Sequence, residues 1–309
     1  MRLLVISPNQ SNKWNWGHQH LRDEFYRHCE VVYYGHGYKE KGDPNIKRVV
    51  DRLGPFDAVL CWDQSYCGYI QSMQDVTIPK LLFLVDYVPT AGKSKKNNDF
   101  INKHGFDVAF LRSTACLNEF HKNQNEHKIP SHTTPVFLPF GVDLTKYKYL
   151  GLRKKYDVCS IFSLVSWAYP RRPALIEAIQ NMNIKYRVAG TNSRNRVVHN
   201  DYIRILNEST MFANSNGTYK SVLMKYFEVM ACNTLLVTDE PTDGNRMRFI
   251  DGENIVYYRN IADAVEKIRY YIAHPIAGMA IANAGSKLVK EYHGNDQRVK
   301  QVLDVIEGF

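Results

Sequence analysis

The stretch GTYKSVLMKYFEVMACNTLLVTD, residues 217–239, contains the pattern that decides the fold. It opens with a polar loop, and its apolar residues then recur at helical spacing for about three turns, from near Ser221 to Asn233. A short apolar run at residues 235–237 follows and leads to Asp239. The sequence therefore predicts a loop, a helix and a buried strand in direct succession.

The expected helix has an apolar face and a polar stripe. Its core-facing residues are predicted to be Val222, Leu223, Phe227, Met230 and Ala231. Ser221, Lys225 and Glu228 are spaced i, i+4, i+7 on one face. Lys225 and Glu228 could form an exposed ion pair, which would contribute only about 0.2–0.5 kcal/mol.

The loop before this helix favours a second interpretation. A polar, glycine-containing loop that leads into a helix on an α/β sheet presents N–H groups and a positive dipole end to a phosphate. Lys225 would then bind a diphosphate, and the ionised carboxylate of Glu228 would accept hydrogen bonds from a ribose diol. The loop residues expected at this site are Thr218, Tyr219 and Ser221.

This stretch resembles the nucleotide-sugar site of GT-B glycosyltransferases, in particular the spore-maturation-protein (CgeB-like) branch within the group 1 glycosyltransferases. The family pattern is roughly Arg-x-Phe-Glu-x-Met-Ala-Cys-Gly, followed by an apolar strand and Thr-Asp. The chain reads Lys225-Tyr-Phe-Glu228-Val-Met-Ala-Cys-Asn233 and then Leu-Leu-Val-Thr-Asp239. The resemblance implies two Rossmann-like, doubly wound α/β domains that face each other across a cleft.

Three positions depart from the family pattern. Lys225 replaces an arginine, and lysine still supplies a point charge to phosphate. Asn233 replaces a glycine, and asparagine is the next best residue for a left-handed helix end. Lys220 stands where related retaining enzymes carry a glutamate, eight residues before Glu228. The stereochemical course of the implied reaction therefore stays open.

Composition excludes several classes of protein. With 309 residues, 44% of them hydrophobic and 23% charged, the chain is long enough for two domains and is not disordered. It has no apolar run of the length needed to span a bilayer, and its N-terminus does not resemble a signal peptide. The six cysteines have no zinc-binding spacing. We therefore expect a cytoplasmic protein, in a bacterium or a phage-infected host.

The charge balance points to the partner. Forty Lys and Arg residues against 31 Asp and Glu residues give a net charge of +9. Such a surplus favours a polyanion, which could be DNA, RNA, an anionic polymer or a membrane surface.

The first half of the chain alternates apolar strands with helices, which is typical of a doubly wound sheet. Asp63 and Asp86 end two of these strands, where an acceptor-side base belongs, although aspartate is also a common cap or turn residue there. GT-B enzymes often place an Asp or His from this half near the acceptor hydroxyl. The resemblance therefore implies Asp86 as the first candidate for the catalytic residue, with His20 as the second.

Candidate acceptor-binding groups come from two loops. The loop after the first strand, at residues 8–20, contains Trp14, Trp16, His18 and His20, which could grip an acceptor or pack the loop down. Lysines cluster in a second expected loop just past Asp86. The acceptor-binding residues predicted from these loops and from the strand ends are Trp16, His18, Asp63, Lys93, Lys95 and Lys96.

The second half repeats the alternation after a crossing segment. We place an acceptor-binding domain at residues 1–149, a donor-binding domain at 150–292 and a final helix at 293–309 that crosses back to the first domain. Arg171 and Arg172 start a helix, an unfavourable place for cations unless an anion binds there. The resemblance assigns the diphosphate to one of them. Ser163 and Gly190, which follow or end strands, complete the expected donor site.

The resemblance implies a metal-independent glycosyltransferase. It would move a sugar from a nucleotide-diphosphate sugar, with UDP favoured, to a hydroxyl acceptor. For the acceptor the preferred hypothesis is a hydroxymethylated pyrimidine in DNA, as in phage-type DNA glycosyltransferases. The alternatives are a cell-envelope polysaccharide or teichoic-type polymer and, from another class, a non-catalytic nucleic-acid-binding protein on a degenerate GT-B scaffold.

Overall fold

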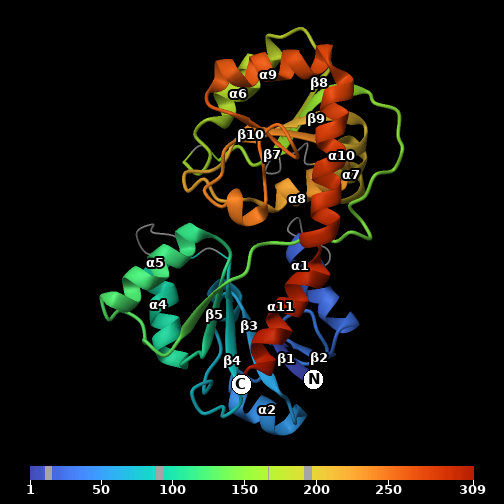
Figure 1. Ribbon diagram of the computed structural model, residues 1–309. Helices are drawn as coiled ribbons and strands as arrows, with labels where there is room; N and C mark the ends of the chain where they lie inside the picture. Colours follow the sequence, from blue (N-terminus) through green and yellow to red (C-terminus); the bar gives the residue numbers. More distant parts are fainter. Residues whose placement is uncertain (11–15, 86, 88–92, 166, 191–196) are drawn as a thin grey trace. The chain divides into compact units, whose positions relative to one another are not determined.

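The structure is a computed structural model that describes residues 1–10, 16–85, 87, 93–165, 167–190 and 197–309, with only the main chain of Trp16 and Lys93. The chain divides into two compact units. The first comprises Met1–Phe140 together with Asp296–Phe309, and the second comprises Gly141–Asn295. Both ends of the chain therefore belong to the first unit (Figure 1).

The first unit contains a parallel six-stranded sheet in the order β2-β1-β3-β4-β5-β6. Its strands are β1 (Arg2–Ile6), β2 (Glu30–Tyr34), β3 (Ala58–Trp62), β4 (Lys80–Leu84), β5 (Val108–Leu111) and β6 (Thr134–Phe137). Its helices are α1 (Trp16–Glu24), the 3-10 turn η1 (Phe25–Arg27), α2 (Ile46–Leu53), α3 (Gln64–Cys67), α4 (Lys93–His104), α5 (Thr114–Asn125) and α11 (Asn295–Glu307). Strands such as AVLCW of β3 are buried along their whole length because helices cover both faces of a parallel sheet.

The second unit contains a parallel five-stranded sheet in the order β11-β10-β9-β7-β8. Its strands are β7 (Tyr156–Phe162), β8 (Tyr186–Gly190), β9 (Ser209–Ala213), β10 (Leu235–Asp239) and β11 (Val256–Tyr258). Its helices are α6 (Arg172–Gln180), α7 (His199–Asn207), α8 (Met224–Ala231), the 3-10 turn η2 (Asn245–Met247), α9 (Ile261–Ala273) and α10 (Pro275–Tyr292). Strand residues such as Val158, Met211 and Leu235 pack with Leu175 and Ile268 from the helices in one core.

The predicted α/β architecture of two doubly wound sheets is confirmed. In each sheet the first strand lies between the next two: β1 separates β2 from β3, and the order β8-β7-β9 repeats this arrangement. Ligands of open α/β sheets bind beyond the carboxyl ends of the strands at such a reversal of strand order. The fold therefore marks two places for binding, one in each unit.

Two local predictions are wrong. The helix in the central stretch begins at Met224, because Lys220 adopts a left-handed conformation with φ 47 and Leu223 is extended. The lysines after Asp86 do not lie in a loop, because Lys93 already begins α4 and Lys95 pairs with Asp99 one turn along that helix. Other local predictions are confirmed: β10 follows α8 directly, and Asn233 has a φ of 58 at the end of that helix.

Among the helices that the structure describes, none has the length and apolar character needed to cross a membrane.

Candidate functional site

The carboxyl edge of the second sheet is organised by a buried arginine. Arg172, the first residue of α6, is 1% exposed. Its Nη1 donates to the carbonyl of Ser163, 2.6 Å away after β7, and its Nε donates to the carbonyl of Ser215, 3.1 Å away after β9. The guanidinium also stacks on Tyr169, with Cζ 3.4 Å from the ring centroid. Arg172 thus links the two loops on either side of the reversal in strand order.

Burial has an electrostatic consequence at this arginine. It lowers the pKa of Arg172 to about 10, so the group stays protonated at neutral pH. The cost of burying this cation is offset by its two carbonyl partners and by the aromatic face of Tyr169.

The loop that precedes α8 is tied to the loop after β7. Thr218 donates its N–H to the carbonyl of Ala168 at 3.0 Å, and a Cβ on Gly217 would lie only 2.9 Å from that same oxygen. Glycine is required at position 217 because the backbone passes too close for a side chain. The N–H of Lys220 donates to Gly217, so two of the loop N–H groups predicted to face a diphosphate are engaged within the protein. Ser221 is buried beside them, and Tyr219 is partly exposed.

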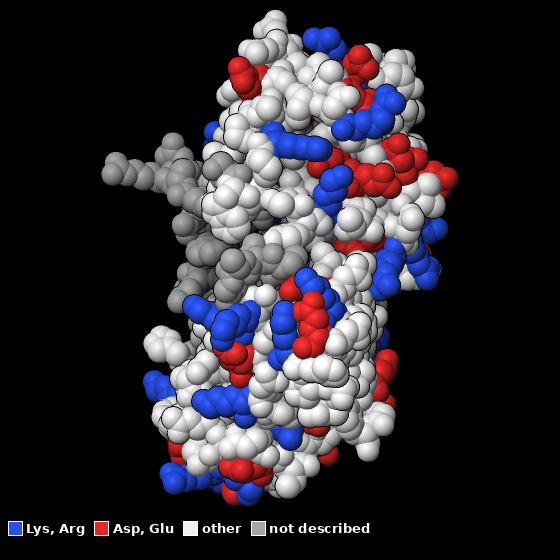
Figure 2. Space-filling view, turned by 90° about the vertical axis from the view of Figure 1, so that its left-hand side faces the viewer, with Lys and Arg blue, Asp and Glu red and all other residues white. Residues whose placement is uncertain are grey.

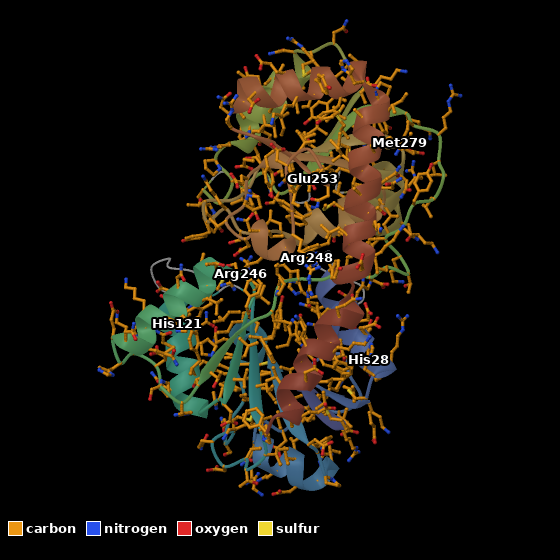
Figure 3. All side chains as sticks on the ribbon, in the orientation of Figure 1. His28, His121, Arg246, Arg248, Glu253 and Met279 are labelled. Atoms are coloured by element: carbon orange, nitrogen blue, oxygen red, sulfur yellow. The ribbon has the colours of Figure 1, made fainter. Side chains whose placement is uncertain are left out.

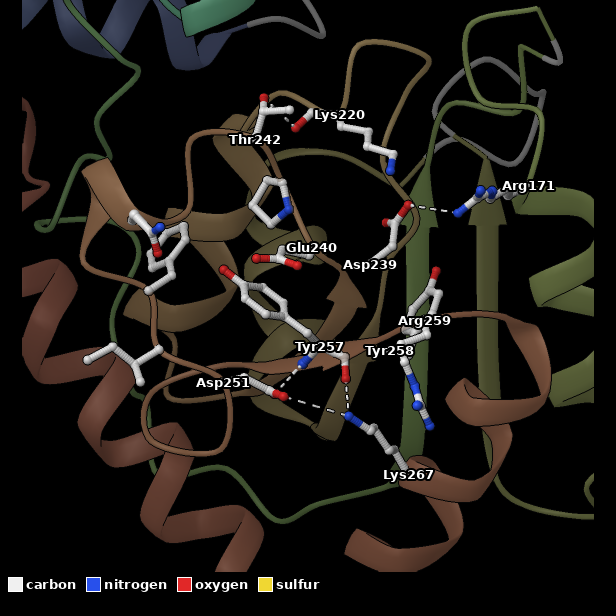
Figure 4. Close-up of a pocket in the computed structure, with 14 residues that line it drawn as sticks. Arg171, Lys220, Asp239, Glu240, Thr242, Asp251, Tyr257, Tyr258, Arg259 and Lys267 are labelled. Carbon is white, nitrogen blue, oxygen red and sulfur yellow. Dashed lines mark hydrogen bonds and ion pairs between the residues drawn. The ribbon is translucent and has the colours of Figure 1, made fainter.

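A pocket of about 930 Å³ opens beside this loop, at the carboxyl ends of β10 and β11 (Figure 4). It brings together Arg171 and Lys220 with residues of the two strand ends and the segment between them. Its charged lining residues are Arg171, Lys220, Asp239, Glu240, Asp251, Arg259 and Lys267. The segment between the strands is fixed at Arg248, whose Cζ lies 3.9 Å from the ring centroid of Tyr292; Figure 3 labels this arginine at the end of η2.

Asp239 is the carboxylate at the inner end of this pocket. Its Oδ1 accepts from the N–H of Asn216 at 2.7 Å, and its Oδ2 lies 3.7 Å from Nη1 of Arg171. Figure 4 shows the side chains of Arg171 and Lys220 directed toward it. Burial raises the pKa of Asp239, while the Asn216 hydrogen bond and both cations oppose that rise. Arg171 is 52% exposed, so it can turn from Asp239 to an anionic ligand.

Lys225 and Glu228 lie in α8 and are not among the residues that line this pocket. Oε2 of Glu228 accepts a hydrogen bond from the hydroxyl of Tyr202 at 3.1 Å, and Tyr147 also hydrogen-bonds to this carboxylate. Burial raises the pKa of Glu228, which is 7% exposed, although Lys225 and the tyrosines act against this rise. Nζ of Lys225 lies 4.6 Å from the Tyr202 ring centroid, and burial lowers its pKa. Lys225 and Glu228 therefore belong to a partly buried cluster with Tyr147 and Tyr202.

The predicted acceptor-binding residues fall in the first unit. Asp63 follows β3 with a φ of 65 and caps α3: its Oδ1 accepts from the N–H of Ser65 at 3.0 Å. His18 and His20 both lie on α1; the ring of His18 is 5.3 Å from that of Phe140, and His20 is buried.

Other predicted residues are either exposed or outside the described part of the chain. Lys95 and Lys96 are exposed in the first turns of α4. Gly190 ends β8 and is buried. The candidate base Asp86 lies outside the described residues, as do the side chains of Trp16 and Lys93. Figure 2 shows basic and acidic side chains intermixed on the face that it presents.

Sequence reasoning assigned no role to Asp239, Tyr257 or Lys267, although these residues line the pocket. Asp239 carried a usable signal, because it ends a buried strand as Asp63 does. Tyr257 and Lys267 carried none, since only the packing of β11 against α9 brings them together: Nζ of Lys267 donates to the carbonyl of Tyr257.

Comparison with known proteins identifies the fold. Residues 171–304 match the model of a family described as glycosyl transferase-like. No curated protein matches the chain. Among solved structures, Anabaena HepE in complex with UDP-glucose has a TM-score of 0.71 at 12% identity, with 100% of each chain covered. A glycosyltransferase from Rickettsia africae has a TM-score of 0.70 at 11% identity, covering 99% of this chain and 98% of that one.

A third similar structure is only partly covered. A variant of S. aureus TarM in complex with fondaparinux, α-GlcNAc-glycerol and UDP has a TM-score of 0.60 at 12% identity. The match covers 84% of this chain and 57% of TarM. Together these likenesses show that the chain has the GT-B fold, as the sequence predicted.

Proposed function

We propose that this protein is a glycosyltransferase that uses a nucleotide-diphosphate sugar, with a UDP-sugar as the first candidate. The observation that carries the proposal is the exposed Arg171, which stands with Lys220 at a pocket on the carboxyl edge of the second sheet. This is the edge at which α/β sheets bind nucleotides. The family match begins at Arg171, and HepE was solved with UDP-glucose.

In the proposed reaction the acceptor oxygen attacks the anomeric carbon, and the bond from that carbon to the diphosphate breaks. Arg171, Lys220 and Lys225 would stabilise the departing diphosphate without a metal ion, and Glu228 would hold the ribose. Arg172 would keep the loops in place rather than touch the phosphates, because its N–H groups already bind two carbonyls. If the enzyme inverts, Asp86 or His20 removes the acceptor proton; if it retains, Asp86 orients the acceptor.

UDP is expected to raise the thermal midpoint of the protein. A ligand at one hundred times its Kd stabilises the native state by about 2.7 kcal/mol, which corresponds to a shift of roughly 5–10 °C in a unit of this size. Thermal denaturation with UDP, GDP and UMP measures the effect, with UMP as the control that lacks the second phosphate. If no nucleotide shifts the midpoint, the proposed enzymatic function is wrong, and the alternative of a non-catalytic nucleic-acid-binding protein is favoured.

For the acceptor we propose an anionic polymer bound by the first unit. The net charge of +9 supports this class of acceptor. The complex of TarM with α-GlcNAc-glycerol favours an envelope-type polymer. The similar proteins lend no support to the DNA acceptor, which stays a prediction.

Loss of charge on α4 is expected to weaken binding of the acceptor. Lys95→Ala with Lys96→Ala should lower affinity for a polyanion and reduce the slope of log affinity against log salt by about 1 for each lysine that contacts a phosphate. Donor hydrolysis should not change. Lys39→Ala with Lys41→Ala, which removes two exposed charges from the same unit, is the control. Equal losses in both double variants would mean that α4 has no specific role.

A further inference from the structure

The first unit buries an arginine at its own reversal in strand order. Arg22, in α1, has no exposed surface. It lies where β1 and β3 are neighbours: Gln10 follows β1, Trp62 ends β3, and both contact its guanidinium. This is the position in the first sheet that corresponds to the donor edge of the second sheet.

The partners of Arg22 are neutral. Its Nη2 donates to Oε1 of Gln10 at 2.9 Å and to Oε1 of Gln19 at 3.0 Å. Its Cζ lies 5.1 Å from the ring centroid of Trp62, which stacks on Phe83. Two amide oxygens and one aromatic face only partly offset the cost of burying a cation, which is several kcal/mol.

Three donor atoms at this place lack an acceptor. Within the part of the chain that the structure describes, Nε and Nη1 of Arg22 and Nε1 of Trp62 are buried and make no hydrogen bond. Buried polar groups nearly always have partners, and each exception requires an explanation. Guanidinium and indole N–H groups only donate, so their missing partner must be an acceptor.

The neighbouring carboxylates do not fill this role. Asp63, next to Trp62 in sequence, accepts from the N–H of Ser65 at 3.0 Å and, through Oδ2, from that of Val85 at 2.8 Å. Asp23 accepts from Nε2 of Gln19 at 2.6 Å. Burial lowers the pKa of Arg22, and Tyr38, Tyr33, Tyr66 and Asp23 oppose that lowering. Within the described chain, Arg22 therefore makes its hydrogen bonds to neutral amides and none to a carboxylate.

We infer that Arg22 and Trp62 form a binding site for an oxyanion, and that the anion is a phosphate ester carried by the sugar acceptor. The oxygens of a phosphate accept hydrogen bonds from N–H groups such as the unpaired Nε or Nη1 of Arg22, and the negative charge of the phosphate balances the positive charge of the guanidinium. The anion site stands on the contacts of Arg22 alone, whereas its assignment to the acceptor rests on the proposed function. Since Arg22 is fully covered, the side chains over it must move to admit the ligand.

The test is an NMR titration of the whole protein labelled with ¹⁵N in tryptophan and arginine. The chain has four tryptophans, so its indole spectrum is simple, and Trp62→Phe assigns the relevant signal. Inorganic phosphate, added at constant ionic strength against chloride, is expected to shift the Trp62 indole and Arg22 Nε signals saturably. Arg22→Lys keeps the charge but loses the planar donor set, and should weaken this response at least tenfold.

Three controls separate the possible outcomes. Arg171→Ala should leave the Trp62 response intact, because Arg171 pairs with Asp239 and is not among the partners of Arg22. UDP should raise the thermal midpoint without shifting the Trp62 and Arg22 signals. The donor proposal and the anion site are therefore tested by separate measurements, and either can fail without the other. Glycerol 3-phosphate and thymidine 5′-phosphate distinguish a polyol phosphate from a nucleotide as the source of the anion. If both signals stay unchanged in the wild-type protein, for instance because buried water satisfies the donors, the inference is wrong.

Discussion

Glu228→Gln is expected to lower kcat/KM for the nucleotide sugar by about 10²- to 10⁴-fold while the protein stays folded. In the proposed function the carboxylate accepts two hydrogen bonds from the ribose diol. Hydrogen bonds to a charged group contribute about 1.5–3 kcal/mol each, and every 1.4 kcal/mol is a factor of ten. Glutamine keeps the size of the side chain but offers one acceptor oxygen and no charge. Transfer from a labelled UDP-sugar measures the loss.

The stability of this variant follows from the direction of the pKa shift. Burial raises the pKa of Glu228 above its unfolded value, so the folded state favours the protonated carboxyl. This contribution to stability is present below the unfolded pKa and is lost as the pH rises through the folded pKa. Glutamine resembles the protonated form and can still accept from Tyr202. We therefore expect Glu228→Gln to unfold at the wild-type midpoint or above it at neutral pH.

Tyr202→Phe is the matched control for Glu228. It removes the hydroxyl that donates to Oε2 but keeps the ring beneath Lys225. If Glu228 binds ribose, Tyr202→Phe should lower activity less than Glu228→Gln, because the carboxylate remains. Should Glu228→Gln instead turn over donor at the wild-type rate, the carboxylate is structural and the ribose lies elsewhere.

The central stretch shows why the fold could be predicted from the sequence. β3 is apolar along its whole length and β10 begins with three apolar residues; both strands are fully buried, and only a sheet covered on both faces accommodates such strands. Asn233 has the left-handed conformation expected at the end of the helix, which asparagine tolerates. These features depend on residues close together in the chain, and a single sequence reveals them.

The details of the site depend on contacts between distant residues. Arg171 and Arg172 are equivalent in the sequence, and only the carbonyls of Ser163 and Ser215 show that Arg172 is engaged. The strained backbone at Lys220 shortens the helix that periodicity extended to Ser221. Arg22 resembles an exposed residue of an amphipathic helix, and its burial against Trp62 becomes visible only when α1 packs on the sheet.

Arg171 and Arg172 are expected to respond oppositely to substitution. Arg171→Ala should leave the thermal midpoint nearly unchanged, because its ion pair with Asp239 is long and half exposed and such pairs contribute little. It should weaken UDP binding about 10- to 100-fold, since charge-assisted hydrogen bonds to the diphosphate are lost. Calorimetric titration with UDP measures this effect.

Arg172→Met should produce the reverse pattern. It strips two carbonyls of their buried donor and removes the cation above Tyr169, which we expect to cost about 2–4 kcal/mol, or roughly 5–15 °C in the midpoint of the second unit. The loops after β7 and β9 are then no longer joined by Arg172. UDP affinity should fall only through the resulting displacement of these loops, because no contact to the phosphates is removed. Added UDP should raise the thermal midpoint of Arg172→Met, which still binds the nucleotide. It should raise the midpoint of Arg171→Ala only slightly, because that variant binds UDP weakly. If Arg172→Met remains as stable as the wild type but no longer binds UDP, Arg172 is the phosphate ligand and the two roles must be exchanged.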